Sequence, residues 1–429
     1  MQIVPTPSLD GQTKGLPVSL NGIDIAAIGR CGWNVLAEDL PLPLALLKDS
    51  ALQHNARWMR GFRAMTGVAI APHGKTSMSP QLFARQLADG AWGISVATAQ
   101  QLRVCRAHGI ERVLLANQLV GKQAIAYVLD ELARDPQFDF YALVDSVAGV
   151  DALARAAVQR AAGRPLKLLV ECGFIGGRTG CRTQEEALAV ARAVAAARPH
   201  LSLAGVEGYE GAVPAATPEG QDDGIRAFIG FMANVAKAAA ATRLFDADPV
   251  VLTAGGSAWF DLASALPRRL NRCATQVVIR SGCYLTHDSD SYARAAACMR
   301  ERMPAIEALG PGLIDALEVW SYVQSMPEAG LAILTMGKRD VSHDLHLPFA
   351  RFTCRPGRDR MPRALSGSYV ITALNDQHAF MRVPRGAGVK VGDMIGCAIS
   401  HPCTTFDKWR FLPIVDDQYN VIEAITTSF

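Results

Sequence analysis

The stretch VAIAPHGKTSMSP, residues 68–80, combines a strand, a loop and the start of a helix. Its first four residues, 68–71, form an apolar run that is typical of a buried strand. Ser79 followed by Pro80 is typical of a helix start, because serine caps the first turn and proline suits the first helical position. The residues between them predict a loop, with a proline and a glycine as turn signals. The stretch is therefore one strand–loop–helix unit of an α/β protein.

The same unit recurs along the chain. Eight apolar runs are predicted as strands: 68–71, 93–96, 113–116, 140–144, 168–170, 203–206, 250–253 and 277–279. Apolar strands that alternate with helices predict a parallel sheet covered on both faces, and eight units in about 220 residues predict a closed (β/α)₈ barrel of the TIM type. An open doubly wound sheet is the alternative. Polar residues follow nearly every predicted strand, which favours the barrel, because an open sheet gathers them at one switch point.

A different pattern surrounds the predicted barrel, which spans residues 44–292. An amphipathic pattern over 44–65 predicts a helix ahead of the first barrel strand. After residue 292 a helix is predicted over 294–309, followed by short β-type segments between Gly/Pro turns. These segments are 316–323, 329–335, 368–374, 378–383 and 393–399. We therefore expect a second, mostly β domain that combines residues 1–43 with residues 293–429.

Composition limits the kinds of partner. The chain of 429 residues is too long for one ordinary core, so two domains are expected. Its net charge is +3 without a long basic run, which gives no electrostatic footprint for nucleic acid. No apolar run reaches about 18 residues, and the N-terminus lacks the basic and apolar regions of a secretory signal. Ten cysteines without CxxC pairs are typical of a reducing compartment, so we expect a cytoplasmic protein without nucleic-acid or membrane partners.

Lys75 lies in the loop that follows the first predicted strand. A (β/α)₈ barrel places its active site at this end of the strands. A lysine held there can be desolvated, which makes its amine a nucleophile toward aldehydes such as pyridoxal phosphate. A solvated loop lysine is the alternative, since charged residues are mostly exposed. Other polar residues that follow predicted strands are Thr98, Asn117, Asp145, Glu171, Arg178, Glu207 and Tyr209.

Two loops of small residues follow the last two predicted strands. One contains Gly255-Gly256-Ser257 and the other Ser281-Gly282-Cys283-Tyr284. Barrels commonly bind phosphate at these two loops, where small residues let backbone N–H groups approach the anion. Each loop alone is equally consistent with a plain turn. Together with Lys75, the two loops predict a pyridoxal phosphate enzyme.

His401 and Cys403 follow the predicted strand over 393–399. In an extended segment alternate side chains share a face, so the imidazole and the thiol are expected on the same side. This N/S pair suits zinc, and two protein ligands suit a catalytic metal completed by water or substrate. A buried histidine beside an ordinary buried cysteine is the alternative. His343 and His346 are interpreted as loop residues that line a cleft.

Seven short motifs, in order, resemble those of the D-serine dehydratase and D-threonine aldolase family. These are fold-type III pyridoxal phosphate enzymes with the alanine-racemase-like fold, a (β/α)₈ barrel plus a β domain. The motifs are PHGKT (72–76), LLANQ (114–118), GRTG (177–180), GVEGYEG (205–211), TAGGS (253–257), SGCY (281–284) and HPC (401–403). The resemblance therefore extends over most of the chain, from about residue 44 to about residue 409.

The resemblance implies roles for individual residues. Lys75 would bind the cofactor covalently, Tyr209 would lie near the pyridine ring, and Arg178 would contact the ring face or its phenolate edge. Backbone N–H groups of the two glycine loops would hold the phosphate, and His401 and Cys403 would bind zinc or another divalent metal. The expected cofactor-binding residues are Lys75, His73, Arg178, Tyr209, Gly255, Gly256, Ser281, Gly282, Cys283 and Tyr284.

The resemblance also implies an activity, a D-amino-acid dehydratase. Such a lyase converts a small D-β-hydroxy amino acid to a 2-oxo acid and ammonia. Cys403 favours this activity, because the aldolases of the family more often have an acidic residue there. A D-threonine-type aldolase, an amino-acid racemase and a non-catalytic pyridoxal phosphate carrier stay open as alternatives. The resemblance further implies a homodimer, and departures such as the insert around 342–362 indicate a subgroup whose substrate need not be serine.

Overall fold

The computed structural model describes residues 9–160, 163–214 and 221–429. The described residues divide into two compact units. Residues 61–75 and those within 86–282 form the first, here called the barrel unit, and residues 9–60, 76–85 and 283–429 form the second, the β unit. This division differs from the predicted boundaries at 44 and 292, because the first part of helix α1 (Asp49–Thr66) groups with the β unit. The units are defined by contacts within the chain, and the predicted domain limits at residues 44 and 292 stay a prediction.

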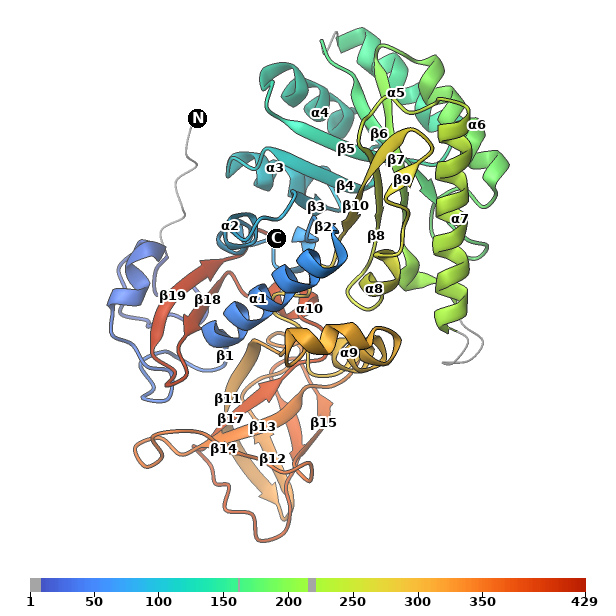
Figure 1. Ribbon diagram of the computed structural model, residues 1–429. Coiled ribbons are helices and arrows are strands. Elements are labelled where there is room, and N and C mark those ends of the chain that lie inside the picture. The colour runs from blue at the N-terminus through green and yellow to red at the C-terminus, as the bar shows by residue number, and fades with distance from the viewer. Residues whose placement is uncertain (1–8, 161–162, 215–220) are drawn as a thin grey trace. The chain divides into compact units, whose positions relative to one another are not determined.

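The barrel unit is a closed ring of eight parallel strands, paired in the order β2-β10-β8-β7-β6-β5-β4-β3 (Figure 1). Two backbone hydrogen bonds close the ring: Trp92 N–H donates to the Ile70 carbonyl over 2.7 Å, and Ser95 N–H to the Pro72 carbonyl over 2.9 Å. The strands are β2 (Ala69–Ile70), β3 (Ile94–Val96), β4 (Arg112–Gln118), β5 (Asp139–Val144), β6 (Leu166–Cys172), β7 (Leu201–Gly208), β8 (Val250–Ala254) and β10 (Cys273–Ile279). The predicted (β/α)₈ barrel is confirmed, with a strand at each of the eight expected places.

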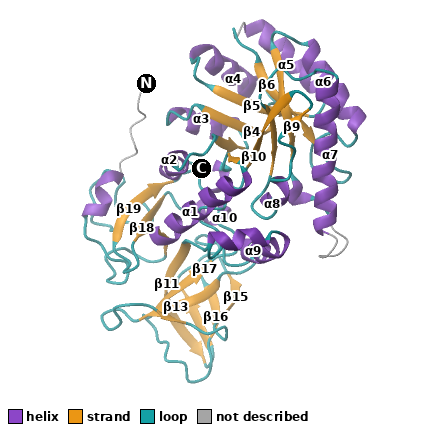
Figure 2. Cartoon of the chain, in the orientation of Figure 1, coloured by secondary structure: helices purple, strands orange, loops and turns teal. Residues whose placement is uncertain are grey.

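Helices form the outer layer of the barrel unit, as Figure 2 shows. They are α3 (Ala99–Ala107), α4 (Lys122–Arg134), α5 (Val147–Arg160), α6 (Gln184–Ala196), α7 (Gln221–Ala241) and the short α8 (Phe260–Ala263). Threonines start two of them. The Thr98 side chain accepts from the Gln101 N–H at the start of α3, and Thr183 forms a capping box with Glu186 at the start of α6. Such caps satisfy N–H groups that have no partner within the helix.

Apolar side chains fill the inside of the barrel, so it is a packed core and not a pore. The buried cluster consists of Ala71, Leu114, Tyr141, Leu143, Leu169, Ala204, Val251 and Val278. The Trp92 ring packs on this cluster, with its centroid 5.2 Å from that of Tyr141. Because the interior is filled, the polar residues of the cavity described below come from the carboxyl ends of strands, such as Glu171 in β6 and Glu207 in β7, and from the loops beyond them.

The β unit is built on a ten-stranded sheet with the main order β14-β13-β17-β11-β1-β18-β19. The other three strands join through β12, which pairs with β11. The strands are β1 (Leu44–Lys48), β11 (Leu317–Glu328), β12 (Leu331–Leu334), β13 (Phe349–Cys354), β14 (Arg363–Ala364), β15 (Val370–Leu374), β16 (Ala379–Arg382), β17 (Met394–Ala398), β18 (Phe411–Val415) and β19 (Val421–Thr426). The predicted mostly β domain is confirmed.

Two helix predictions in this unit were wrong in part. The first residues of the predicted helix over 44–65 form strand β1, which pairs with β11 and β18. An apolar run suits either a helix or a buried strand, and here the partners come from distant parts of the chain. The predicted helix over 294–309 is divided into α9 (Ser291–Arg302) and the 3₁₀ turn η4 (Pro304–Leu309). Pro304 separates them, since proline cannot donate within a helix.

The N-terminal segment joins the β unit, as the sequence predicted. Val421 N–H donates to the Trp33 carbonyl over 2.8 Å, and Asn34 forms a bridge to Asn420. The 3₁₀ helix η1 (Ile25–Arg30) also lies against β19. Residues 33–34 therefore extend the edge of this sheet, and η1 packs against it.

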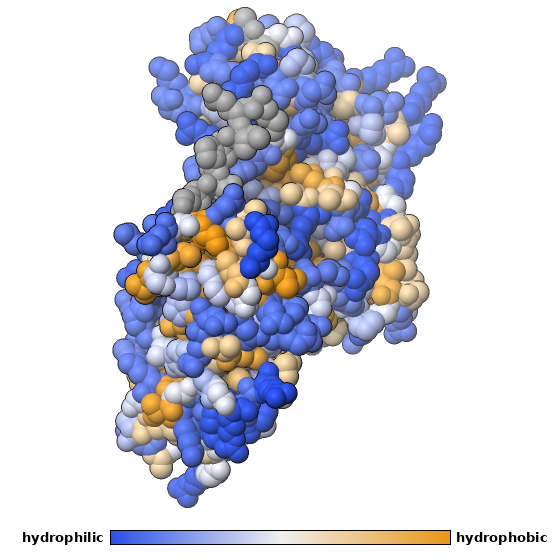
Figure 3. Space-filling model, turned by 90° about the vertical axis from the view of Figure 1, so that its left-hand side faces the viewer, coloured by the Kyte–Doolittle hydropathy of each residue, from blue (hydrophilic) through white to orange (hydrophobic). Residues whose placement is uncertain are grey.

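The described helices include none that is long and apolar enough to cross a bilayer. On the face shown in Figure 3, hydrophobic residues occur in groups separated by hydrophilic ones. All ten cysteines have free thiols. Six of these cysteines are buried, and Cys31 and Cys298 are exposed.

Gly205 permits the close approach of two barrel strands. A Cβ atom there would lie 1.8 Å from the carbonyl oxygen of Val251, the residue that it faces in β8. That carbonyl belongs to the backbone of a paired strand and cannot rotate away. The contact between β7 and β8 therefore requires glycine.

We expect Gly205→Ala to destabilise the protein by at least the usual cost of overpacking, about 1–3 kcal/mol, because backbone must move. The matched control is Gly230→Ala on the exposed face of α7, where a Cβ meets nothing within 4 Å. Alanine favours a helix interior over glycine by about 0.5–1 kcal/mol, so the control should be neutral or stabilised. Chemical denaturation of both variants measures the difference. Equal losses in the two variants would contradict the close approach.

Candidate active site

A cavity of about 230 Å³ lies among the loops that follow the carboxyl ends of the barrel strands. Its lining residues are His73, Lys75, Ala97, Ala116, Asn117, Glu171, Arg178, Thr179, Glu207, Tyr209, Gly255, Gly256 and Arg280. Six of the ten predicted cofactor-binding residues therefore lie together. The other four, at 281–284, are outside this lining. Within it, the chemistry is concentrated in an amine, a histidine, two arginines and two glutamates.

Lys75 lies in the 3₁₀ turn η2 (Gly74–Thr76), a few residues after β2, and lines the cavity. Its side chain is exposed. The expectation that the surrounding protein desolvates this amine was therefore wrong, whereas its expected place beyond a strand end was correct. An accessible primary amine at a cavity meets the first requirement for the covalent attachment of an aldehyde.

His73 provides a buried ring nitrogen, Nδ1, that has no hydrogen-bond partner. Burial keeps the pKa of this imidazole well below its ordinary value, and the nearby cations Lys75, Arg280 and Arg178 lower it further. The ring is therefore neutral at pH 7. A neutral imidazole with a free nitrogen can form one hydrogen bond to a bound molecule.

The Arg280 guanidinium and the Glu207 carboxyl group contact each other in the buried cavity wall. Arg280 also donates to the Thr253 hydroxyl over 2.8 Å and to the Gly208 carbonyl over 3.2 Å. Burial raises the pKa of Glu207 to about 8, with Arg280 opposing the shift and two nearby glutamates adding to it. Its Oε2 atom has no hydrogen-bond partner. The pair therefore offers the cavity an oxygen that changes from donor to acceptor near neutral pH.

Tyr209 is fixed between two glycines. A Cβ at Gly256 would lie 3.1 Å from the tyrosine ring, and one at Gly211 would lie 2.5 Å from its hydroxyl oxygen. The Arg178 guanidinium lies 5.0 Å from the ring centroid, within the range of a cation–π contact. Gly255 has a φ of +101°, in the left-handed region that favours glycine. The small residues of this loop thus make room for the ring as well as for a tight turn.

Glu210 binds the loop that was predicted to hold a phosphate. Its carboxylate accepts from the Gly255 N–H over 2.8 Å and from the Gly256 N–H over 2.6 Å. Burial raises the pKa of Glu210, and these two bonds oppose the rise. The prediction that Gly255 and Gly256 bind a phosphate through their N–H groups stays a prediction, and it requires Glu210 to release them. The Ser257 and Ser281 hydroxyls, 3.3 Å apart, are alternative donors.

Sequence reasoning missed two residues of the site, Arg280 and Glu210. Arg280 directly follows β10, so the same rule that found Glu207 at a strand end could have found it. Glu210 gave no such signal, because its role depends on a distant loop folding onto it. Two expected residues, Thr98 and Asp145, do not line the cavity. Thr98 caps α3, and Asp145 accepts a hydrogen bond from the Gly180 N–H.

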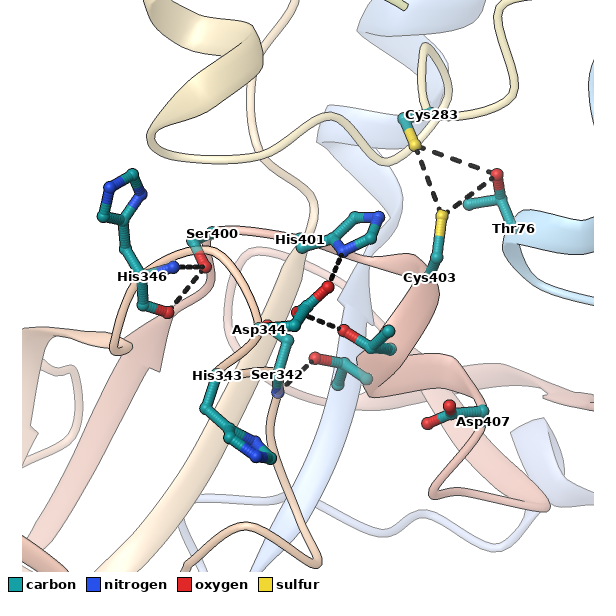
Figure 4. Close-up of polar contacts among 12 residues, drawn as sticks. Thr76, Cys283, Ser342, His343, Asp344, His346, Ser400, His401, Cys403 and Asp407 are labelled. Atoms are coloured by element: carbon teal, nitrogen blue, oxygen red, sulfur yellow. Dashed lines mark hydrogen bonds and ion pairs between the residues drawn. The ribbon is translucent and has the colours of Figure 1, made fainter. Parts of the chain in front are cut away.

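The second predicted centre, His401 and Cys403, lies in the β unit (Figure 4). The expected extended geometry was wrong, because Pro402 is helical and α10 (Cys403–Phe406) begins directly after it. The turn nevertheless places the two side chains together. Hydrogen bonding to the Cys403 thiol, and then the nearby Asp344, raise the pKa of His401 to about 9.

His343 and His346 line a separate cavity of about 720 Å³, as expected of them.

The Cys403 sulfur lies beside a second thiol. Its Sγ is 3.8 Å from Cys283 Sγ and 3.5 Å from the Thr76 hydroxyl oxygen. Hydrogen bonding to Cys283 and to His401 lowers the pKa of Cys403 well below its ordinary value, while the same sulfur contact and burial raise that of Cys283. Cys283 was expected to bind a phosphate through its N–H, and Figure 4 shows its side chain directed at Cys403. Cys403 is thus the thiol that is poised to act as a thiolate.

A thiolate and an imidazole together form a donor set that suits zinc. Across the described ranges, no three His, Cys, Asp or Glu side chains form a metal-binding group. A metal held by His401 and Cys403 alone would have open coordination positions, as catalytic metal sites do. In the barrel unit, the Lys75 amine, the unpartnered His73 Nδ1 and Glu207 Oε2, and the serine hydroxyls fit the aldehyde, ring and phosphate of pyridoxal phosphate.

Two family models match the chain. The model described as "Alanine racemase, N-terminal domain" matches residues 48–258, and the one described as "Putative serine dehydratase domain" matches residues 316–415. The first covers most of the barrel unit and the second covers much of the β unit. The first span includes Lys75 and the second includes His401 and Cys403, whereas Arg280 and Cys283 lie outside both.

Curated relatives include both aldolases and a dehydratase. The D-threonine aldolase of Arthrobacter sp. is 28% identical over 387 residues, which are 89% of this chain and 90% of that protein. The 3-hydroxy-D-aspartate aldolase of Paracoccus denitrificans (strain Pd 1222) is 26% identical, over 86% of this chain and 88% of that protein. The D-threo-3-hydroxyaspartate dehydratase of Delftia sp. (strain HT23) is 30% identical over 152 residues, which are 35% of this chain and 39% of that protein.

Solved structures share the fold. The D-threonine aldolase of Filomicrobium marinum has a TM-score of 0.74 at 22% identity, covering 92% of this chain and 97% of that one. The D-threo-3-hydroxyaspartate dehydratase of Delftia sp. HT23 has a TM-score of 0.69 at 22% identity, covering 92% and 99%. Two variants of a dehydratase of that name, with a histidine and, two positions later, a cysteine replaced by alanine, are also similar. The cysteine variant is described as metal-free.

The raised pKa of Glu207 predicts a pH dependence of stability. Since its folded-state pKa of about 8 exceeds the ordinary value of 4.5, the folded protein binds more protons than the unfolded chain between these values. This contribution to stability is complete below the ordinary value and is lost as pH rises through about 8. We expect the wild type to lose stability relative to Glu207→Gln between about pH 5 and about pH 9. Denaturant titrations at several pH values measure it, with the exposed Glu185→Gln as a control, and parallel profiles would contradict the assignment.

Proposed function

The chain belongs to the D-serine dehydratase and D-threonine aldolase family of pyridoxal phosphate enzymes, and we propose that it is a metal-dependent dehydratase of D-β-hydroxy amino acids. Its products are a 2-oxo acid and ammonia. The observation that supports this choice is the His401–Cys403 pair, in which the thiol has a lowered pKa. The two alanine variants of the related dehydratase have the same spacing, and one of them is metal-free. The same proposal includes a small D-amino acid as the ligand and a homodimer as the assembly.

Residues of the barrel unit provide for the carbon centre. Pyridoxal phosphate, when bound, supplies an electron sink for charge at Cα. Lys75 would hold the cofactor through its amine and would act as the base for the Cα proton. The neutral His73 ring and the Arg280–Glu207 pair would hold the heterocycle, and Arg178, stacked on Tyr209, would limit the space beside it.

Residues of the β unit provide for the leaving group. Hydroxide is a poor leaving group, and a divalent metal supplies the Lewis acidity that improves it. His401 and Cys403 are the ligands that this proposal assigns to the metal. Their N/S donor set favours zinc over harder cations, which prefer carboxylate and water oxygens. A substrate with an amino group and a β-hydroxyl therefore suits both centres: the amino group suits the cofactor site, and the hydroxyl suits the metal.

An aldolase is the second candidate, supported by the full-length similarity to the Arthrobacter D-threonine aldolase. An aldolase must remove the hydroxyl proton and break Cα–Cβ, which gives glycine and an aldehyde. Metal on a hydroxyl assists that deprotonation as well as elimination, so the products decide between the two activities.

Purified protein with pyridoxal phosphate and zinc should be given D-serine, D-threonine and D-threo-3-hydroxyaspartate. Oxo acid that disappears with a chelator supports the dehydratase, whereas glycine supports the aldolase.

Cys403→Ala should abolish oxo-acid formation while the visible absorbance of the bound cofactor persists, because the thiol belongs to the metal centre and Lys75 is intact. Lys75→Ala should lose both the activity and that absorbance. The control is Cys298→Ala, which changes an exposed thiol on α9 and should leave both readouts unchanged. Normal turnover in the Cys403→Ala protein would remove the metal from the proposed reaction.

A further inference from the structure

Asp344 contacts the proposed metal ligand from the side of a separate loop. Its Oδ2 atom lies 2.6 Å from Nδ1 of His401, and its Oδ1 accepts a hydrogen bond from the Thr404 hydroxyl, also over 2.6 Å (Figure 4). We propose that Asp344 is a positioning residue that fixes His401 to bind the metal through Nε2. This inference rests on the metal role assigned to His401 and Cys403 above.

The argument starts from the two nitrogens of the imidazole ring. A nitrogen that donates its proton to a carboxylate cannot bind a metal, so the contact with Asp344 leaves Nε2 as the nitrogen that can bind one once its proton is released. The carboxylate also makes the ring a stronger electron donor and prevents its rotation. Figure 4 shows Asp344 on one side of the His401 ring and the Cys403 sulfur on the other. The free nitrogen is thus on the side where the thiol is found.

Asp344 is itself held in place by more than burial, since its side chain is 40% exposed. The loop that contains it is tied to the segment around His401 at both ends. On one side, the Ser342 N–H donates to the Thr405 hydroxyl over 2.9 Å. On the other, the Ser400 hydroxyl donates to the His346 carbonyl over 2.8 Å and accepts from the His346 N–H over 3.3 Å. These bonds fix the backbone on either side of Asp344.

An exposed ion pair is the competing interpretation of the same contact. Exposed pairs contribute about 0–1 kcal/mol to stability and nothing specific to a ligand. Two features distinguish Asp344 from such a pair: both of its oxygens are engaged, and both contacts are to the HPC turn and its first helical residues. A positioning role predicts an effect on metal affinity. An ordinary pair predicts only a small effect on stability.

The test measures metal binding directly and does not depend on turnover. Protein freed of metal with a chelator is titrated with Zn²⁺ against a chromophoric competitor, and separately with Co²⁺, whose absorption reports a bound thiolate. Asp344→Asn should weaken Zn²⁺ binding by about 10–100-fold, the usual effect of losing such a partner, while the thiolate absorption persists at saturating Co²⁺. The thermal stability of the metal-free protein should change little.

Asp407→Asn is the matched control. Asp407 follows the same short helix, is 41% exposed and pairs with Lys408, and in Figure 4 no dashed line joins it to His401. Its substitution should leave the affinity unchanged. Thr404→Val is a second test that keeps the carboxylate and removes one of its two anchors, and it should weaken binding by less than Asp344→Asn does.

The outcomes separate this inference from the proposed function. Wild-type affinity in Asp344→Asn would overturn the positioning role while leaving the metal centre intact. Equal losses of affinity in Asp344→Asn and Asp407→Asn would overturn it too, because the effect would then be one of general charge. A wild type that binds Co²⁺ without thiolate absorption would overturn the metal role of Cys403 and this inference with it. If Asp344→Asn fails to fold, the affinity of Thr404→Val alone supports or overturns the proposal.

Discussion

The hydrogen bonds between β2 and β3 are the constraint on which the barrel unit depends. β2 and β3 lie at the two ends of the strand order, which runs from β2 through β10 to β3. The hydrogen bonds between these two end strands turn the curved sheet into a closed ring. Once the ring is closed, loops that are far apart in sequence share one rim, because all eight strands run in the same direction. Lys75 and Arg280 follow the two strands β2 and β10, which are neighbours in the ring although they are the first and last of the eight along the chain. The cavity exists because of that adjacency.

Buried charge is the second feature that the rim has to accommodate. Glu171, Glu207 and Glu210 are all buried there, and unpaired burial of a carboxylate is costly. Each carboxyl group has different partners. Glu171 accepts hydrogen bonds from Thr179 and Gln118, and Glu207 contacts Arg280. Glu210 accepts hydrogen bonds from two backbone N–H groups. Their pKa values are nevertheless all raised, because burial outweighs these partners. These carboxyl groups therefore bind protons more tightly than in water, whereas His73 binds its proton less tightly, and such shifts suit proton-transfer chemistry.

In the β unit the pKa shifts favour charged side chains, whereas the shifts at the barrel rim favour neutral ones. The Cys403 thiol has a lowered pKa and the His401 imidazole a raised one, so this pair favours charge rather than neutrality. The hydrogen bond with Cys283 lowers the pKa of Cys403 first, and the His401 imidazolium and the thiolate then stabilise each other. Asp344 adds to the stabilisation of the cationic ring. The protein thus contains two centres with opposite electrostatic character. A thiolate beside an imidazole suits a soft metal once the ring releases its extra proton, and a neutral histidine beside an amine suits an organic cofactor.

The sequence by itself determined the barrel, since apolar runs of strand length alternating with helices have few other solutions. Residue type, spacing and the resemblance to a known family made Lys75 and the His401–Cys403 pair candidates. The sequence did not determine strand β1, because the apolar run at 44–48 acquires its conformation from β11 and β18, which are hundreds of residues away. Nor did it determine which donors of the glycine loop are engaged: only the folded chain brings Glu210 onto Gly255 and Gly256. Asp344 is a similar case, since nothing local marks it as a partner of His401. Local patterns report what a segment can form, whereas contacts between distant segments depend on geometry that only the closed fold supplies.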